Sequence, residues 1–461
     1  MTAHSAYAHR ASRLLDGLQV ILLCGIAVIS VVSAPRQMLF QAAAAPNIPI
    51  EFLIVALSLP DYFVIGLIAL LALRLLIDGA YRERLSDTLS LISARFGGAW
   101  WVMLALWMAA GMLWAGTPVL ARYSAVHFVG ALAASFVMAD LVRAGHGCSM
   151  IWSLLIGALA QTLLAVLQVL NNNPLGLYAL GEIPRFWYAP ASFYRAPGLS
   201  SHPNYLGGYL MLVLFACAML AVQRRREGHS LMLPALIGLA CGIGLVATLS
   251  RSALLSTAVG FAPLIAWLIL SLRGRARLAA GIALIIVVTA AGVWGWIVLD
   301  GDVQTRLFAP REFFFADSWE IIQEAPVVGV GAGNLMMNIL RVRGESVSEL
   351  LPVHNVYLFV WAELGLPGLA LFVAGCGAIL FQVRRRMGEE ALIWGCAFLA
   401  VCSVMIFDNY FWAVHPFRVL TFWVIGLWWG YASRAVDRDG AVQARSMLNN
   451  ASTADPDSSA F

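Results

Sequence analysis

The chain has 461 residues, of which 61% are hydrophobic and only 12% are charged. Soluble domains average about 25% charged residues, so this composition excludes a soluble globular protein and predicts a polytopic membrane protein. The formal net charge of +4 indicates little by itself. We expect membrane lipid around the chain and no nucleic-acid partner.

Twelve apolar runs are each long enough to cross about 30 Å of hydrocarbon as a helix. A backbone in lipid must satisfy its own hydrogen bonds, so these runs are predicted to be helical. They lie near residues 17–34, 61–77, 99–115, 120–142, 150–170, 203–222, 231–249, 253–270, 278–299, 355–381, 391–407 and 417–433. The first run is expected to stay as a helix, because no convincing cleavage site follows it.

The predicted fold class is therefore an all-α polytopic membrane protein with about 12 transmembrane helices. They form one membrane domain over residues 1–436, and the polar tail 437–461 is predicted to be disordered.

The arginines indicate the orientation, because the chain has 29 basic residues and none of them is a lysine. With twelve spans, the clusters beside and between the helices all fall on one side of the membrane. They are Arg10 and Arg13, then Arg82, Arg84 and Arg95, then Arg224–Arg226, then Arg273, Arg275 and Arg277, then Arg384–Arg386, then Arg434, Arg438 and Arg445. The positive-inside rule makes that side the cytoplasm, so both termini are predicted to be cytoplasmic. Segments 171–202 and 300–354 then form two long outer excursions, and a miscounted span would shift this topology.

The first excursion brings arginine close to the outer membrane surface. Arg195 lies in FYRAPGLSSHPNYLGGYLML, and Arg251 lies at a tight junction of two predicted helices, in LSRSALL. Each could simply extend to lipid headgroups. Outer arginines beside a polar loop also favour an anionic substrate, because guanidinium groups bind phosphate oxygens in a bidentate way.

The second excursion is richer in polar residues and contains Arg306 and Arg311. Residues 312–323, EFFFADSWEIIQ, predict an amphipathic helix on the bilayer surface, which Pro326 ends. The run Gly329–Gly333 could be a backbone turn or could offer N–H groups to phosphate. We favour the turn, because lone glycine patterns are weak signals.

His354 closes the second excursion and is the histidine we single out. It could be an interfacial residue, or a proton acceptor whose pKa lies near ambient pH. His202 and His415 both precede proline, so we interpret them as loop or helix-entry residues of lower rank.

Carboxylates within predicted spans are candidate site residues by default. We interpret Glu363 as making a structural hydrogen bond at a helix break near Gly365. Asp408, near the outer end of a span, could face the same cavity and pair with an arginine. Asp140 is interpreted as interfacial.

The outer Asp-x-Asp sequence, Asp300–Asp302, is the one candidate metal motif in the excursions. It is also an ordinary turn. The arginines already supply positive charge, so we expect neither a metal nor a cofactor.

Four sequence segments together resemble the O-antigen ligase and O-antigen polymerase superfamily. They are RAPGLSSHPN, TLSRSALL, PVVGVGAGN and HNVYLFVWAELGLPGLALF. The resemblance covers about residues 190 to 380, whereas the N-terminal third matches no motif. It implies a GT-C-like membrane glycosyltransferase that uses a lipid-linked sugar donor at the periplasmic face of the bacterial inner membrane.

In the ligase of this superfamily, the donor is undecaprenyl-pyrophosphate-linked O-antigen and the acceptor is a sugar of the lipid A core. The resemblance places the family's essential residues on Arg195, Arg311 and His354, and another recurrent position on Arg251. It implies that the arginines bind the donor pyrophosphate and that His354 accepts the acceptor's proton, in a metal-independent inverting transfer. Asp408, His202, Asn355 and Arg306 are secondary site residues. Arg195, Arg311 and His354 should line one outward-facing cavity.

Three functions remain open from the sequence. The first is the O-antigen ligase; the second is an O-antigen polymerase or a protein O-oligosaccharyltransferase of the same superfamily. The third is a twelve-helix transporter, although transporters tend to show two related halves and this chain shows two unequal excursions.

Overall fold

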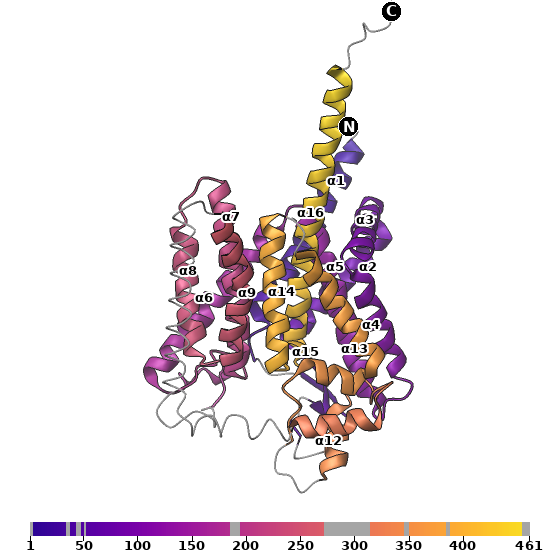
Figure 1. Cartoon of the computed structure of the whole chain (residues 1–461), viewed down its shortest axis with the longest axis vertical. Coiled ribbons are helices and arrows are strands. Elements are labelled where there is room, and N and C mark those ends of the chain that lie inside the picture. The colour runs from indigo at the N-terminus through magenta and orange to yellow at the C-terminus, as the bar shows by residue number, and fades with distance from the viewer. Residues whose placement is uncertain are drawn as a thin grey trace, which may run out of the picture.

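The computed structural model describes residues 3–33, 37–42, 48–49, 52–184, 194–271, 314–344, 350–383 and 388–453. These residues are mainly helical, with one small hairpin, β1–β2 (Figure 1). In the first half of the chain the elements are α1 (Ala3–Ile29), β1 (Gln37–Gln41), β2 (Ile54–Leu57), α2 (Leu59–Ile77), α3 (Gly79–Arg95), α4 (Gly98–Gly111), α5 (Pro118–Arg143), α6 (Gly147–Asn171) and η2 (Tyr178–Leu180). In the second half they are α7 (Pro203–Arg226), α8 (Met232–Ala247), α9 (Arg251–Ser271), a helix over 314–324, α12 (Leu335–Arg343), α13 (Val356–Val383), α14 (Glu389–Phe407), α15 (Tyr410–Ala413) and α16 (His415–Thr453).

Every predicted apolar run that falls within the described residues is helical, and an all-α polytopic membrane protein is what the helices support. The count of twelve spans is not confirmed. Among the described residues, eight helices are long and apolar enough to cross a membrane, or up to nine if the bent pair α3 and α4 forms one span.

Four predicted runs are not among these eight helices, and they differ in where the structure places them. The run 99–115 became α4, which has 14 residues and follows α3 after a bend of 92°; it is about 21 Å long and cannot cross the bilayer alone. The run 231–249 became α8, with 16 residues. The run 417–433 lies within α16, and 278–299 lies outside the described residues.

The hairpin between α1 and α2 was not predicted. Its strands pair antiparallel, with Gln37 opposite Leu57 and Gln41 opposite Ile54. The Oη of Tyr123, in the first turns of α5, donates to the Ala56 carbonyl at 2.6 Å and fixes the hairpin against the bundle.

One end of the molecule is held by arginine–carboxylate pairs, and we call it the charged end. Arg225 pairs with Glu389 at 2.6 Å, and Arg143 pairs with Asp437 at 2.7 Å. The first pair joins the end of α7 to the start of α14, and the second joins the end of α5 to the middle of α16. Figure 1 shows that α1 begins and α16 ends on this side, whereas α12 lies on the opposite side, which we call the site end.

The centre of the bundle is the contact between α5 and α16. Gly426 and Gly430 form a small-xxx-small pair on α16, which allows two helix backbones to approach closely. A Cβ on Gly426 would lie 2.7 Å from the Ser135 carbonyl oxygen of α5. Phe128 of α5 also packs against Phe422 of α16, with ring centroids 5.0 Å apart. The contact with α5 therefore fixes the position of α16, whose first residues lie at the site end.

Candidate active site

Arg195 is held at the site end by two other segments of the chain. Its Nε donates to the Thr248 carbonyl at 3.2 Å, and its Nη2 donates to Asn204 Oδ1 at 2.7 Å. Burial, and then the nearby charge of Arg251, lower the pKa of Arg195 to about 10. The guanidinium therefore stays cationic at neutral pH, in a place fixed by α7 and by the turn between α8 and α9.

The turn between α8 and α9 places a second cation beside the first. Arg251 is the exposed first residue of α9, and the backbone N–H of Ala196 donates to the Ala247 carbonyl at 3.2 Å. Leu249 has a φ of +50°, a left-handed conformation that is unusual for a side chain with a Cβ. Strained backbone is often found at functional sites. Two arginines within electrostatic range favour an anion between or beside them.

His202 lies between Arg195 and the second excursion. It is the N-cap of α7, and its Nδ1 accepts from the Asn204 backbone N–H at 3.0 Å. Burial lowers the pKa of His202 to about 3, and the charges of Arg195 and then His354 act in the same direction. His202 is therefore neutral at physiological pH, and Arg195 and His354 both lie within electrostatic range of it.

The end of α14 connects the first excursion, through Asn204 of α7, to the second excursion. The Asp408 Oδ2 accepts from Asn204 Nδ2 at 2.8 Å, and Asn204 in turn holds Arg195. The next residue, Asn409, donates from Nδ2 to the Val353 carbonyl at 2.9 Å. Asn355 donates to the Ile406 carbonyl at 3.0 Å. The backbone on each side of His354 is thus tied to α14.

His354 is half-buried next to the helix 314–324. Its ring stacks against Phe314, with centroids 5.8 Å apart and an angle of 25° between the planes. The Nδ1 atom is enclosed and has no hydrogen-bond partner within the described ranges. Since Nδ1 is enclosed, Nε2 is the nitrogen that can face a substrate.

The amphipathic helix predicted over 312–323 is present as the helix over 314–324. Ile321 and Ile322 are buried on one face, whereas Phe315 and Trp319 are exposed on the other. Asp317 is also buried and pairs with Arg343 of α12. The ion pair joins this helix to α12.

The glycine run forms a turn, as predicted, and packs on a break in α13. Gly329, Gly331 and Gly333 all have positive φ angles, of +68°, +90° and +72°. The backbone N–H groups of Val330 and Gly331 donate to the Ala362 and Glu363 carbonyls at 3.0 and 2.8 Å. These two N–H groups are therefore used within the protein, which favours the turn over a phosphate-binding loop.

Glu363 is buried at the break in α13, where Gly365 has a φ of +65°. Its Oε1 accepts from the Leu335 backbone N–H at 3.4 Å, at the start of α12. This contact agrees with the predicted structural hydrogen bond. Asp140 is buried within the protein, where Arg84 donates to its carboxylate at 2.8 Å. Its interfacial position stays a prediction.

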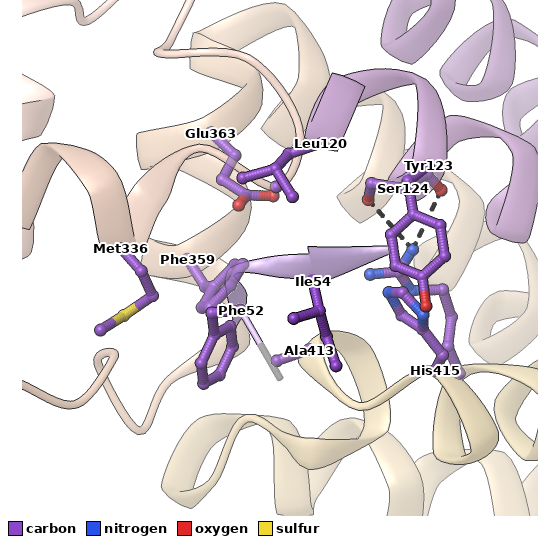
Figure 2. Close-up of a pocket in the computed structure, with 12 residues that line it drawn as sticks. Phe52, Ile54, Leu120, Tyr123, Ser124, Met336, Phe359, Glu363, Ala413 and His415 are labelled. Carbon is purple, nitrogen blue, oxygen red and sulfur yellow. Dashed lines mark hydrogen bonds between the residues drawn. The ribbon is translucent and has the colours of Figure 1, made fainter. Parts of the chain in front are cut away.

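A small cavity with mixed polar and apolar walls lies beside Glu363, between the hairpin, α5 and the start of α16 (Figure 2). Arg418 lines it and is buried; its Nε donates to the Trp412 carbonyl at 2.7 Å, and its Nη1 donates to the Ser124 carbonyl and Oγ, each at 3.2 Å. His415 also lines the cavity. The volume of about 40 Å³ suits a water or two and excludes a sugar ring.

Several of these residues do not stand out in the sequence. Arg418 lies inside a predicted span, which was a usable signal for a buried polar contact. His127 also went unnoticed; its Nδ1 lies 3.2 Å from the Asp61 carboxylate, and its ring packs against His415 at 4.2 Å.

The structure brings together most of the predicted site residues. Arg195, Arg251, His202 and Asp408 lie at the site end with His354, and Asn355 caps α13 through its Oδ1, which accepts from the Leu358 N–H at 3.0 Å. Arg306, Arg311 and the Asp300–Asp302 motif lie outside the described residues, so a cavity shared with Arg311 stays a prediction. Over the described ranges, no group of three or more His, Cys, Asp or Glu side chains could hold a metal ion.

A family model described as O-antigen ligase matches residues 235–373. The match includes α8, the turn with Arg251, the glycine turn and His354, and it excludes Arg195 and Asp408. None of the curated proteins compared with the chain matches it. Residues 235–373 of the chain are therefore similar to the O-antigen ligase family.

Proposed function

We propose that this protein is an O-antigen ligase. It would transfer O-antigen polysaccharide from undecaprenyl pyrophosphate to a sugar hydroxyl of the lipid A core, at the periplasmic face of the bacterial inner membrane. The observation that carries the proposal is the hydrogen-bonded chain from Arg195 through Asn204 and Asp408–Asn409 to Val353, next to His354. This series of hydrogen bonds supports the view that the cationic site and the histidine act on one pair of substrates.

In the proposed reaction, Arg195 and Arg251 hold the donor pyrophosphate, together with Arg311. The bond between the anomeric carbon and the phosphate oxygen breaks, and the electron pair stays on the pyrophosphate, whose charge the arginines stabilise. The acceptor hydroxyl attacks the anomeric carbon from the opposite face. Its proton passes to Nε2 of His354, and the new glycosidic bond has the inverted configuration. No metal takes part in these steps.

The polymerase and protein O-oligosaccharyltransferase functions differ from the ligase in their acceptor, so a deletion strain separates them. We expect loss of the gene to leave lipopolysaccharide as bare core, with polymer stranded on the lipid carrier, when lipopolysaccharide is resolved on a gel. Core that carries a single repeat unit would identify a polymerase instead. Unchanged lipopolysaccharide with a loss of glycosylated protein would identify the oligosaccharyltransferase.

Substitutions at the site test the roles of single residues. His354→Ala should lower the rate of transfer by about 10²- to 10⁴-fold, the usual contribution of a general base, while donor binding persists. Arg195→Ala should weaken donor binding as well. Purified variants in detergent, assayed for transfer and for binding of the lipid-linked donor, give both readouts. Transfer by His354→Ala at the wild-type rate would show that the proton acceptor is another group.

A further inference from the structure

Asp408 and Asn409 are neighbours whose side chains reach different segments. Asp408 contacts Asn204 at the start of α7, and Asn409 contacts Val353 in the second excursion. Asp408 ends α14 with an extended backbone, at φ −155° and ψ 163°. Successive side chains on extended backbone point to opposite sides. Both side chains are buried, and each has its polar atoms engaged: Asp408 toward Asn204, and Asn409 toward Val353.

The Asp408 side couples a carboxylate to Arg195 through an amide. Asn204 accepts from Arg195 at 2.7 Å and donates to Asp408 at 2.8 Å. A direct salt bridge would place the negative charge against the guanidinium and compete with an anionic ligand. The intervening amide instead orients Arg195 and leaves its charge available to a pyrophosphate.

The Asn409 side fixes the backbone that carries His354. Val353, the residue before the histidine, accepts from Asn409 through its carbonyl. Asn355, the residue after the histidine, donates to the Ile406 carbonyl. Val353 is buried. The position of His354 is therefore set by the same end of α14 that orients Arg195.

We infer that Asn204 and Asn409 are positioning residues that set the distance between the donor-binding arginine and the acceptor-activating histidine, with Asp408 as the partner that Asn204 requires. The inference rests on the proposed function. It predicts different kinetic effects for Asn204, which contacts Asp408, and for Asn409, the residue next to Asp408. Asn204 acts on donor binding, and Asn409 acts on the chemical step.

The test is a steady-state transfer assay on the purified full-length protein, with undecaprenyl-pyrophosphate-linked O-antigen and lipid A core. Asn204→Ala should raise the donor KM by about tenfold, since a hydrogen bond to a charged group is lost, with a smaller change in kcat. Asn409→Ala should lower kcat by about tenfold and keep the donor KM within about twofold of wild type.

A pair of exchanged side chains tests the Asn204–Asp408 contact itself. Asn204→Asp alone places two carboxylates together and should raise the donor KM. Adding Asp408→Asn restores one donor and one acceptor in the reverse order, so the double variant should regain most of the melting temperature that Asn204→Asp loses. Its donor KM should stay raised, because a carboxylate now lies directly against Arg195.

The control is Asn338→Ala on α12, where the amide also donates to a backbone carbonyl, that of Asn334, at 3.0 Å. It should leave both parameters at wild-type values. If the two alanine variants change the same parameter, or if the exchanged double variant regains none of the lost melting temperature, the positioning inference is wrong. If the wild-type protein itself transfers nothing from this donor, the proposed function fails first, and the two failures are distinct.

Discussion

Single residues at the site end differ in the charge state that their surroundings favour. His202 is partly buried and lies near the charge of Arg195, so burial and that charge hold its pKa at about 3, well below the ordinary 6.5. In the unfolded chain the same imidazole binds a proton below about pH 6.5. The folded state therefore binds fewer protons than the unfolded state between these two values.

The low pKa of His202 makes the stability of the protein depend on pH. The stabilisation from neutral His202 is fully present above pH 6.5 and is lost as the pH falls toward 3, at up to about 1.4 kcal/mol per pH unit. His202→Asn keeps an N-cap acceptor for the Asn204 N–H and removes the titration. The melting temperature in detergent, measured from pH 7 to pH 5, should fall more steeply for wild type than for the variant.

The matched control is His229→Asn, because His229 is an exposed histidine at the charged end. Its melting temperature should follow the wild-type curve. Parallel curves for wild type and His202→Asn would contradict the assignment of a proton-excluding environment to His202.

The candidate site could be predicted from sequence only where a residue stands out by type. Arg195 and His354 stand out because charged or titratable side chains are rare in this chain. Asn204 and Asn409 do not, since a neutral amide near a helix end is common, and their roles depend on partners 204 and 56 residues away. Pairings at such separations follow from helix packing, which local pattern does not contain.

At the scale of elements, the break in α13 and the glycine turn form one unit. The helix stops at Gly365, and its free carbonyls accept from the turn, while the Leu366 N–H donates to the Pro326 carbonyl at 3.0 Å. The Nε1 of Trp107 donates to the Leu364 carbonyl at 2.7 Å. The backbone groups that the break frees thus find partners within the protein, as a membrane interior requires.

This unit predicts a contrast between two glycines of α13. Gly365→Ala must place a Cβ against the Val327 carbonyl at a φ of +65°, which costs about 1–3 kcal/mol for the backbone alone. Gly377→Ala meets nothing within 4 Å in a helical segment and should be neutral or stabilising by up to about 1 kcal/mol. Thermal unfolding monitored by size-exclusion chromatography measures both. An equally stable Gly365→Ala variant would mean that the turn can separate from α13.

Helices were the more predictable elements, because long apolar runs have one stable backbone in lipid. It was less predictable which of these helices are long enough to cross the membrane. The run 99–115 is apolar throughout, but Gly97, with a φ of +77°, turns the chain sharply and leaves α4 too short. The hairpin β1–β2 went unpredicted, since its two strands are short and are separated by residues 42–53 rather than by a tight turn.

At the scale of the whole molecule, the two ends have opposite chemistry. Arginine–carboxylate pairs hold the charged end, and the candidate site occupies the other. We propose that the charged end is cytoplasmic, in agreement with the positive-inside rule.

Labelling of single cysteines tests this orientation. In a variant without the seven native cysteines, Asn173→Cys after α6 should react with a membrane-impermeant maleimide added to intact spheroplasts. Ser230→Cys, between α7 and α8 at the charged end, should react only after lysis. The reverse pattern would invert the topology and place the candidate site in the cytoplasm.

The close approach of α5 and α16 at Gly426 and Gly430 has a mechanical consequence. Helices in backbone contact cannot slide past each other without first separating, so this pair acts as a stationary frame during turnover. Asn409 is attached to that frame just before α16 begins. For the proposed ligase, adaptation to a new sugar donor therefore falls to residues 194–204 and to the turn that carries Arg251. Directed evolution should randomise those segments except Arg195, Asn204 and Arg251, and should leave α5 and α16 unchanged.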